Sequence, residues 1–381
     1  MRQYLTLISC ITLIVGIWTL ICIICNLIRF HYINRKGRNY TLPSSPLVSI
    51  IIPARNEEEN LPALLSSMIE QEYKNIEILV VDDKSQDKTW SIIKEFEKKD
   101  SRVKGFQTDD VKLSNHGKIN AMLHIIDKAK GKYLLCTDAD TIHNKDSVLN
   151  ALKTMEAFSF DILSGFPSEV SSSYLARTIT ASMIFSNVFI PHFIFNTLQL
   201  SAFAIGIGQF VMMNKDAYNS VGGYAKIEGE ICDDLAIIKL FMKNGKKYGF
   251  TSLKKSVTCK MYDTGRDAFR GIERSISGVF PPSKILFVGL IVAVILLISI
   301  YFLPLLTPLF IHYDLNNLLY IALFGWLLTY ISWFIAGRSL NFKYSTSLSS
   351  SLTVLAICAM FIHGLYIRLR GKKFIWKGRE V

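Results

Sequence analysis

The sequence lacks a cysteine framework, an internal repeat and a low-complexity tract. Its seven cysteines are scattered. Cys22 and Cys25 have CxxC spacing, but they lie inside an apolar run, where this spacing marks one face of a helix. Cys136, Cys232 and Cys259 stand singly in the central part of the chain. We therefore expect neither a disulfide framework nor a zinc site.

Acidic residues are also in deficit, with 31 Asp and Glu against 43 Lys and Arg, a net charge of +12. A basic protein can bind nucleic acid, but no nucleic-acid module is visible, and the basic residues gather beside apolar segments instead. They are Arg29, His31, Arg35, Lys36 and Arg38 after the first apolar run, and Arg368, Arg370, Lys372, Lys373, Lys377 and Arg379 at the tail. Such clusters bind anionic lipid headgroups. The expected partner is a lipid bilayer, not nucleic acid.

Charge is almost absent from four apolar runs, at 5–28, 285–310, 318–336 and 351–367. A helix needs about 20 apolar residues to cross a bilayer. The first run is too long for a signal-peptide core, lacks a cleavage site and precedes a basic cluster, so residues 1–30 are predicted to be a transmembrane anchor. Residues 284–368 are predicted to form transmembrane or re-entrant helices, and 369–381 a basic juxtamembrane tail.

The basic clusters also predict the topology. Basic flanks stay cytosolic, so we expect a multi-pass protein of the cell membrane with a cytoplasmic catalytic domain. Three full crossings after that domain would place the basic tail outside. Residues 285–310, which contain Pro304 and Pro308, are therefore expected to bend back, leaving the tail in the cytosol.

Residues 44–283 have ordinary charge density and alternate between strand-like and helix-like patterns. Apolar runs predict strands at 48–53, 76–81, 103–106 and 132–137. Helical spacing of apolar residues predicts helices at 57–71, 85–99 and 118–129. This alternation predicts an α/β fold with a parallel sheet. Ligands of such sheets bind beyond the carboxyl ends of the strands.

Polar clusters follow three of these strands, at 55–57, 82–83 and 138–140, so they are expected to meet in one pocket. Asp138 and Asp140 offer hard oxygen ligands of the kind that Mg²⁺ or Mn²⁺ prefers, and such an ion bridges diphosphate oxygens. A DxD string alone is also common in solvated turns. Asp82-Asp83 is interpreted either as an acceptor for a base or ribose, or as a helix cap with Ser85. Lys118 is either a phosphate contact or an exposed lysine at a helix start.

Four successive strings resemble the signatures of family 2 glycosyltransferases, at 49–57, 80–89, 117–121 and 137–140. The resemblance covers roughly 48–278. It implies an α/β GT-A fold, a Rossmann-like domain for nucleotide-diphospho-sugars, and the apolar runs predict N- and C-terminal transmembrane helices on either side of it. It also implies a UDP-sugar donor, a divalent metal and inversion at the anomeric carbon. Carried over residue by residue, it places Ala54 and Glu57 by the nucleotide, Asp83 by the uracil, Asp138 by the ribose and Asp140 on the metal.

Later segments narrow the resemblance. Residues 208–218 with 222–224 are similar to the acceptor-side segment of that family. Residues 257–262, 265–278 and 375–379 resemble a membrane branch that includes carotenoid-acid (diaponeurosporenoate) and hopanoid-associated glycosyltransferases. Processive synthases carry Gln-x-x-Arg-Trp, whereas Arg270 and Arg274 here have no tryptophan after them, which favours transfer of a single sugar. These two arginines either contact diphosphate or lie on anionic headgroups.

An inverting transfer to a hydroxyl or carboxylic acid needs a group that takes the acceptor proton. The family places it in a Glu-Asp pair followed by x-x-Leu, and here Asp233 replaces the Glu and Ile237 the Leu. Asp234 is the expected base, with Asp233 and Glu230 as fallbacks. Repulsion between adjacent acids is expected to raise one pKa. The alternative is a solvated pair at a helix start.

Residues 178–214 contain no Asp, Glu, Lys or Arg, and Pro191-His192 interrupts them. A crossing here would put Asp138 and Asp234 on opposite sides of the membrane. We therefore expect an interfacial apolar segment beside the active site, forming the platform for a membrane lipid acceptor, with a buried helix pair as the alternative. His192 is interpreted as a break point. Two rival functions are transfer to a polyprenyl phosphate, which needs no base, and a non-catalytic membrane scaffold with a donor-binding domain.

Overall fold

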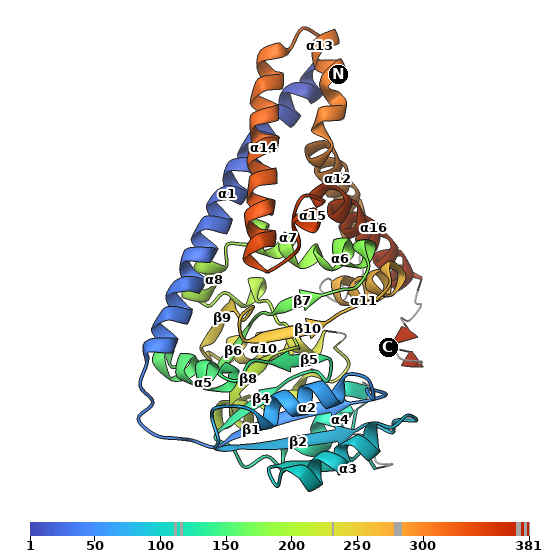
Figure 1. The fold of residues 1–381 in the computed structure, drawn as a ribbon. Helices are drawn as coiled ribbons and strands as arrows, with labels where there is room; N and C mark the ends of the chain where they lie inside the picture. Colours follow the sequence, from blue (N-terminus) through green and yellow to red (C-terminus); the bar gives the residue numbers. More distant parts are fainter. Residues whose placement is uncertain are drawn as a thin grey trace. The chain divides into compact units, whose positions relative to one another are not determined.

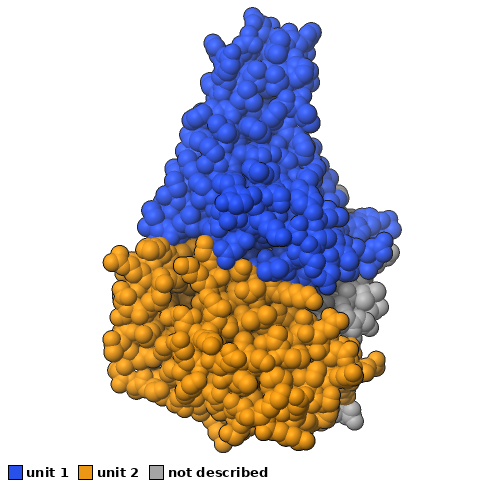
Figure 2. Space-filling model, viewed as in Figure 1, with its two compact units in different colours: residues 1–28, 169–192, 261–381 blue, residues 29–168, 193–260 orange. Residues whose placement is uncertain are grey.

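The structure is a computed structural model, and it describes residues 1–109, 113–114, 117–230, 232–277, 284–370, 375–376 and 379–380. The chain forms two compact units, drawn in different colours in Figure 2. The sheet unit comprises residues 29–168 and 193–260, and the helical unit comprises residues 1–28, 169–192 and 261–381.

A seven-stranded sheet forms the centre of the sheet unit, in the order β3-β2-β1-β4-β8-β6-β9 (Figure 1). Its strands are β1 (Val48–Ala54), β2 (Ile76–Asp82), β3 (Val103–Gln107), β4 (Tyr133–Cys136), β6 (Ile162–Phe166), β8 (Val211–Asn214) and β9 (Tyr248–Ser252). The first four are parallel to one another, as predicted, whereas β8 runs antiparallel to both β4 and β6. A short strand β5 (Thr141–His143) pairs antiparallel with β10 (Val257–Lys260).

Helices connect these strands: α2 (Leu61–Ile69), α3 (Thr89–Lys99), α4 (Gly117–Ile126), α5 (Ser147–Phe158), α9 (Lys215–Val221) and α10 (Asp233–Lys243). The alternative in which Asp82-Asp83 forms a helix cap with Ser85 is wrong. Helix α3 begins at Thr89, whose N–H and hydroxyl both donate to Asp87 Oδ1, at 2.9 and 2.6 Å. The hydroxyl of Ser85 instead accepts the N–H of Asn56 at 2.9 Å, so Ser85 joins the loops that follow β1 and β2.

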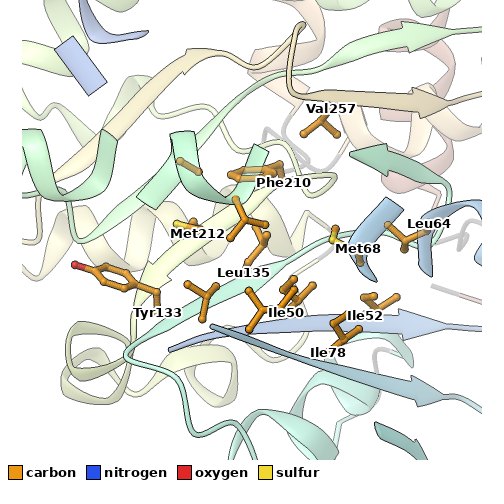
Figure 3. Packing of buried hydrophobic residues seen from close by; sticks show 14 of the residues in the cluster. Ile50, Ile52, Leu64, Met68, Ile78, Tyr133, Leu135, Phe210, Met212 and Val257 are labelled. Atoms are coloured by element: carbon orange, nitrogen blue, oxygen red, sulfur yellow. The ribbon is translucent and has the colours of Figure 1, made fainter. Parts of the chain in front are cut away.

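The core of the sheet unit lies on the central strands. Residues 48–52 of β1 are 0 % exposed, which requires cover on both faces of the sheet. Figure 3 shows Ile50, Ile52 and Ile78 packed near Leu64 and Met68 of α2. Full burial of such a side chain contributes about 1.5–3 kcal/mol, and this packing holds the ends of β1 and β2 in place.

The helical unit contains residues 1–28 of α1 (Arg2–Asn39), together with α6 (Tyr174–Thr180), α7 (Ser182–Phe189), α11 (Gly265–Ser277), α12 (Lys284–Tyr301), α13 (Thr307–His312), α14 (Asn316–Ser339), α15 (Tyr344–Ser347) and α16 (Ser350–Leu369). Helices α1 and α14 approach closely at two glycines. A Cβ on Gly16 would lie 2.3 Å from the carbonyl oxygen of Gly325. Small residues at a crossing are typical of helices that pack inside a membrane.

Three described helices, α1, α14 and α16, are long and apolar enough to cross a membrane. The chain bends by 82° between Ile291–Tyr301 and Leu303–His312, beside Pro304. That residues 285–310 turn back within the membrane stays a prediction. Strands β11 (Ile375–Trp376) and β12 (Arg379–Glu380) pair antiparallel in the tail. Lys372, Lys373 and Lys377 lie outside the described residues. The side on which the tail lies stays a prediction.

The apolar segment 178–214 is only partly as predicted. Its helices break at Pro191, since α7 ends at Phe189 and α8 (His192–Leu198) follows. Its assignment as interfacial is wrong at the C-terminal end, where β8 is inserted between β4 and β6 and Val211, Met212 and Met213 are at most 1 % exposed. Here the absence of charge reflects a buried strand, not contact with lipid.

Candidate active site

A pocket at the carboxyl end of β4 brings together charged side chains from three separate elements of the sheet unit. Lys118 comes from the start of α4, Asp138 from the turn after β4, and Asp233 and Asp234 from the start of α10. The full lining consists of Pro53, Lys118, Met122, Cys136, Thr137, Asp138, Gly208, Val211, Tyr224, Asp233 and Asp234. Of the predicted site residues, Lys118, Asp138, Asp233 and Asp234 therefore share one pocket.

Lys118 bridges the two sides of this pocket. Its Nζ lies 2.8 Å from Asp138 Oδ1 and 3.4 Å from Asp233 Oδ2. Burial opposes the charge of the ammonium, but the carboxylates of Asp138, Asp233 and Asp234 outweigh that effect and raise the pKa of Lys118. Its side chain is 21 % exposed, so the alternative of an exposed lysine at a helix start does not hold.

Asp234 is held by two backbone donors. Gly208 donates its N–H to Oδ2 at 2.8 Å, and Leu235 donates its N–H to Oδ1 at 2.8 Å. Burial, together with the charge of Asp233, raises the pKa of Asp234 to about 6, against the opposing effects of Lys118 and the two N–H donors. Asp233 is only 9 % exposed, so the pair is not a solvated helix start. A carboxylate of this kind is suited to accept a proton near neutral pH.

Glycines bring the loop before β8 against α10. A Cβ on Gly206 would lie 2.4 Å from the carbonyl oxygen of Asp234, and one on Gly208 would lie 3.0 Å from Lys118 Nζ and 3.4 Å from Asp234 Oδ2. Any other residue at position 206 would push this loop away from the acid pair. The absence of a side chain at position 206 therefore allows the backbone to reach Asp234, and a side chain at position 208 would crowd Lys118 and Asp234.

The residues expected around the nucleotide lie at the ends of β1 and β2. The carbonyl of Ala54 accepts the N–H of Asp83 at 2.8 Å, and Arg55 donates from Nη1 to the carbonyl of Asp83 at 2.7 Å. Asp83 is only 6 % exposed. Its carboxylate accepts a hydrogen bond from the hydroxyl of Thr108 at 3.3 Å and lies 3.7 Å from Arg55 Nη1. Ala54 and Asp83 are thus held together.

Asp82 and Glu57 take part in the loops at the same edge. Asp82 accepts the N–H of Ser85 at 3.1 Å and the side-chain amide of Gln107 at 3.1 Å, so it stabilises the turn after β2. Glu57 accepts the side-chain amide of Asn60 at 2.9 Å and donates its N–H to Thr89 Oγ1 at 2.8 Å. Neither Glu57 nor Asp83 lines the pocket around Lys118.

Asp138 and Asp140 occupy the turn between β4 and β5. The carbonyl of Asp138 accepts the hydroxyl of Thr141 at 2.8 Å, and the carbonyl of Asp140 accepts the N–H of Lys260 at 3.0 Å. Asp140 Oδ1 lies 3.5 Å from the buried thiol of Cys259, and Asp140 is not part of the pocket lining.

These residues fit a divalent metal shared with a ligand better than a metal held by protein alone. Within the described ranges, no group of three His, Cys, Asp or Glu side chains is placed to hold an ion. The half-exposed carboxylates at 138 and 140 nevertheless supply hard oxygen donors. Mg²⁺ is commonly bound by one or two carboxylates, with the remaining positions filled by phosphates and water. The donor set therefore suits an ion that arrives with a diphosphate.

The structure leaves some predicted residues apart from this pocket and adds others. Arg270 and Arg274 lie on α11 in the helical unit, and Glu230 is exposed on a loop. Their roles stay predictions. Gly208, Tyr224 and Cys136 line the pocket although sequence reasoning gave them no individual role. The strings around Gly208 and Tyr224 resemble an acceptor-side segment, and this resemblance is the sequence feature that could have placed both residues in the pocket. No sequence feature indicates that the buried Cys136 lines it.

The family model described as glycosyl transferase family 2 matches residues 49–222. This segment runs from β1 through the turn at Asp138 and Asp140 to the end of α9. It thus includes both strand ends at Ala54 and Asp83, as well as Lys118 and Gly208.

Similar proteins agree with this match. A UDP-Glc:alpha-D-GlcNAc-diphosphoundecaprenol beta-1,3-glucosyltransferase of Escherichia coli is 39 % identical over 110 residues, 29 % of this chain and 41 % of that protein. An uncharacterized glycosyltransferase of Haemophilus influenzae is 37 % identical over 110 residues, and the match spans 42 % of its length. A solved mannosyltransferase of Pyrobaculum calidifontis, in complex with GDP-Man and Mn²⁺, covers 97 % of this chain with a TM-score of 0.51 and 17 % identity. This last likeness concerns the GT-A fold.

Proposed function

We propose, from the premise that residues 49–222 form a domain of glycosyl transferase family 2, that this chain transfers a single sugar from a UDP-sugar to a lipid-like membrane acceptor with inversion. The observation that carries the proposal is the joining of Asp138 and the Asp233–Asp234 pair through Lys118 in one pocket. Such an arrangement suits an enzyme that holds a donor diphosphate beside an acceptor base.

The donor is proposed to lie along the ends of β1, β2 and β4. Ala54, Glu57 and Asp83 would contact the nucleoside, with the fixed Asp83 carboxylate accepting from the uracil, and Asp138 would contact the ribose. Asp140 would hold Mg²⁺ or Mn²⁺, which when bound supplies positive charge to the diphosphate. The similar Escherichia coli protein is named for a UDP-Glc donor, which supports a UDP-sugar here.

Asp234 is proposed to take the acceptor proton. As the O–H bond of the acceptor breaks, its proton passes to an Asp234 oxygen, and the acceptor oxygen forms a bond to the anomeric carbon. The bond from that carbon to the diphosphate breaks, and UDP leaves with the electron pair. Attack from the face opposite the leaving group inverts the configuration. The raised pKa of Asp234 supports an acceptor that bears a proton over a polyprenyl phosphate, which is already ionised.

A lipid acceptor is supported by two observations. Three described helices are long and apolar enough to cross a bilayer, and the similar Escherichia coli protein is named for a diphosphoundecaprenol-linked acceptor. In the sheet unit, Leu198, Leu200 and Phe203 are 61 %, 41 % and 50 % exposed, shortly before the loop that reaches Asp234. We propose that these side chains meet the apolar part of a glycolipid, carotenoid or hopanoid acceptor.

The proposal is tested by incubating membranes that contain the protein with a panel of radiolabelled UDP-sugars and extracting the lipids. We expect label from one UDP-sugar to enter the organic phase, and EDTA to abolish this transfer. If the protein hydrolyses no donor and labels no lipid, with Mg²⁺ and Mn²⁺ each supplied, the scaffold alternative is favoured.

A further inference from the structure

We propose that His143, acting through Thr137, is a positioning residue that fixes the turn carrying Asp138 against the Gly208-Gln209 backbone beside Asp234. This inference rests on the proposed function, because it concerns the distance between the donor-side turn and the acceptor base. His143 lies on β5 and is 3 % exposed. It touches none of the residues assigned to the nucleotide, the metal or the acceptor.

Two threonines connect His143 to both sides of the pocket. His143 Nε2 lies 3.0 Å from Thr137 Oγ1 and 3.3 Å from Thr141 Oγ1. The hydroxyl of Thr137 donates to the carbonyl of Gln209 at 2.8 Å, and the hydroxyl of Thr141 donates to the carbonyl of Asp138 at 2.8 Å. Gln209 is the next residue after Gly208, whose N–H binds Asp234. One imidazole therefore joins the donor-side turn to the acceptor-side loop through two hydroxyls.

The contacts around the ring favour a proton on Nε2 of His143. The two threonine oxygens also lie 2.9 Å apart. With both hydroxyls donating to backbone carbonyls, the 3.0 Å contact between His143 and Thr137 is a hydrogen bond that Nε2 donates. On the other side of the ring, Nδ1 lies 3.3 Å from Ser147 Oγ. The hydroxyl of Ser147 and the N–H of Val148 both donate to Gln71 Oε1, at 3.1 and 3.2 Å, so the proton of Ser147 is not directed at Nδ1. Burial lowers the pKa of His143 to about 3, so the ring is neutral near pH 7. Its single proton is assigned to the shorter contact, which runs from Nε2 to Thr137 at 3.0 Å, against 3.3 Å from Nδ1 to Ser147.

The network is fixed from behind by packing. The N–H of His143 donates to Ser67 Oγ on α2 at 3.1 Å. The side-chain amide of Gln71, just after α2, donates to the carbonyl of Asn144 at 2.9 Å, and the His143 ring lies 5.9 Å from the ring of Phe210. Phe210 is 0 % exposed and immediately follows Gln209. His143 is therefore set between α2 and the loop that leads to β8, which suits a residue that sets the position of others.

The first test uses Thr137→Val, which keeps the size of the side chain and removes its hydroxyl, with Thr137→Ser as the matched variant that retains it. We expect Thr137→Val to lower kcat about 10- to 100-fold, since a misplacement of about 1 Å can cost this much. Binding of UDP with Mn²⁺ should weaken by a smaller factor than kcat falls, because the turn carries Asp138 whereas transfer also requires the alignment with Asp234. Thr137→Ser should restore kcat to within about threefold of wild type.

Equal losses in Thr137→Val and Thr137→Ser, or a Thr137→Val enzyme with wild-type kcat, would overturn the proposal. A wild-type protein that transfers no sugar at all refutes the proposed function instead. The second test is then independent of activity. In ¹⁵N-histidine-labelled full-length protein in detergent, assigned by loss of its signal in His143→Gln, we expect the neutral Nε2–H tautomer from pH 8 to about pH 5. A proton on Nδ1, or a charged ring within that range, would overturn the geometry.

Discussion

The N–H of Gly208 lies 2.8 Å from Asp234 Oδ2, and this hydrogen bond joins the loop before β8 to the start of α10. The bond fixes the orientation of the carboxylate while leaving it lone pairs for an acceptor proton. Lys118, paired with both Asp138 and Asp233, brings positive charge to the same place. The chemistry of the proposed transfer depends on these contacts.

Asp234→Asn is expected to retain UDP-sugar binding and to lose transfer, with kcat lower by about 10²–10⁴-fold, the usual worth of a general base. Wild-type kcat should rise with pH through about 6, because the raised pKa of Asp234 leaves the carboxylate protonated below that value. The measurement is a kcat–pH profile. Asp216→Asn, which removes an exposed carboxylate from the first turn of α9, is the control and should leave the profile unchanged. Near-normal turnover by Asp234→Asn would show that the base is elsewhere.

Lys118→Met is expected to move the acidic limb of the same profile to higher pH. The positive charge of Lys118 lowers the pKa of Asp234, so its removal should raise that pKa and leave less of the base ionised near neutrality. The donor KM should also rise, because Asp138 loses its partner. Lys132→Met removes an exposed pair with Glu156 at 3.2 Å and should change little, since such surface pairs contribute about 0–1 kcal/mol. If the acidic limb of the Lys118→Met profile moves to lower pH, Lys118 does not lower the pKa of Asp234 as proposed.

Gly208→Ala is expected to lower kcat at least about tenfold, because the added methyl would lie 3.0 Å from Lys118 Nζ and 3.4 Å from Asp234 Oδ2. The neighbouring groups would have to move by a few tenths of an ångström. Gly289→Ala is the matched control, since nothing lies within 4 Å of a Cβ at that position. Kinetics and thermal unfolding of the two variants should be compared. If both variants have wild-type kcat, the close approach is not required for catalysis.

Asp140→Asn and Asp83→Asn should separate metal binding from nucleotide binding. Asp140→Asn is expected to raise the Mn²⁺ concentration for half-maximal activity at least about tenfold, because an amide is a weaker ligand than a carboxylate for a hard cation. Asp83→Asn should raise the UDP-sugar KM and leave the metal requirement unchanged, since Asp83 contacts Thr108 and Arg55. Titrations of metal and donor for each variant provide the measurement. A similar metal requirement in both variants would contradict the separate roles.

The sequence predicted the parallel part of the sheet well, because β1 and β2 are apolar runs ended by polar clusters, a pattern that is local. It did not predict β8, because an antiparallel strand inserted between β4 and β6 has the same uncharged composition as an interfacial helix. The sequence also did not predict the pairing of Lys118 with Asp233, because these residues are far apart in the chain and only the order of the strands in the sheet brings them together. Ile237 stands where the family pattern has leucine. It is 0 % exposed, so it fills an apolar position in the core as leucine would.

The central claim is tested most directly by mass spectrometry of lipids extracted from cells that express the wild-type chain or Asp234→Asn at equal levels. The account predicts a lipid species that is heavier by a single sugar residue in the wild-type extract and absent from the variant extract. A mass difference identifies the sugar class, and the shifted species identifies the acceptor. Extracts that do not differ, or a ladder of species with many added sugars, would contradict the transfer of one sugar to a membrane lipid through Asp234.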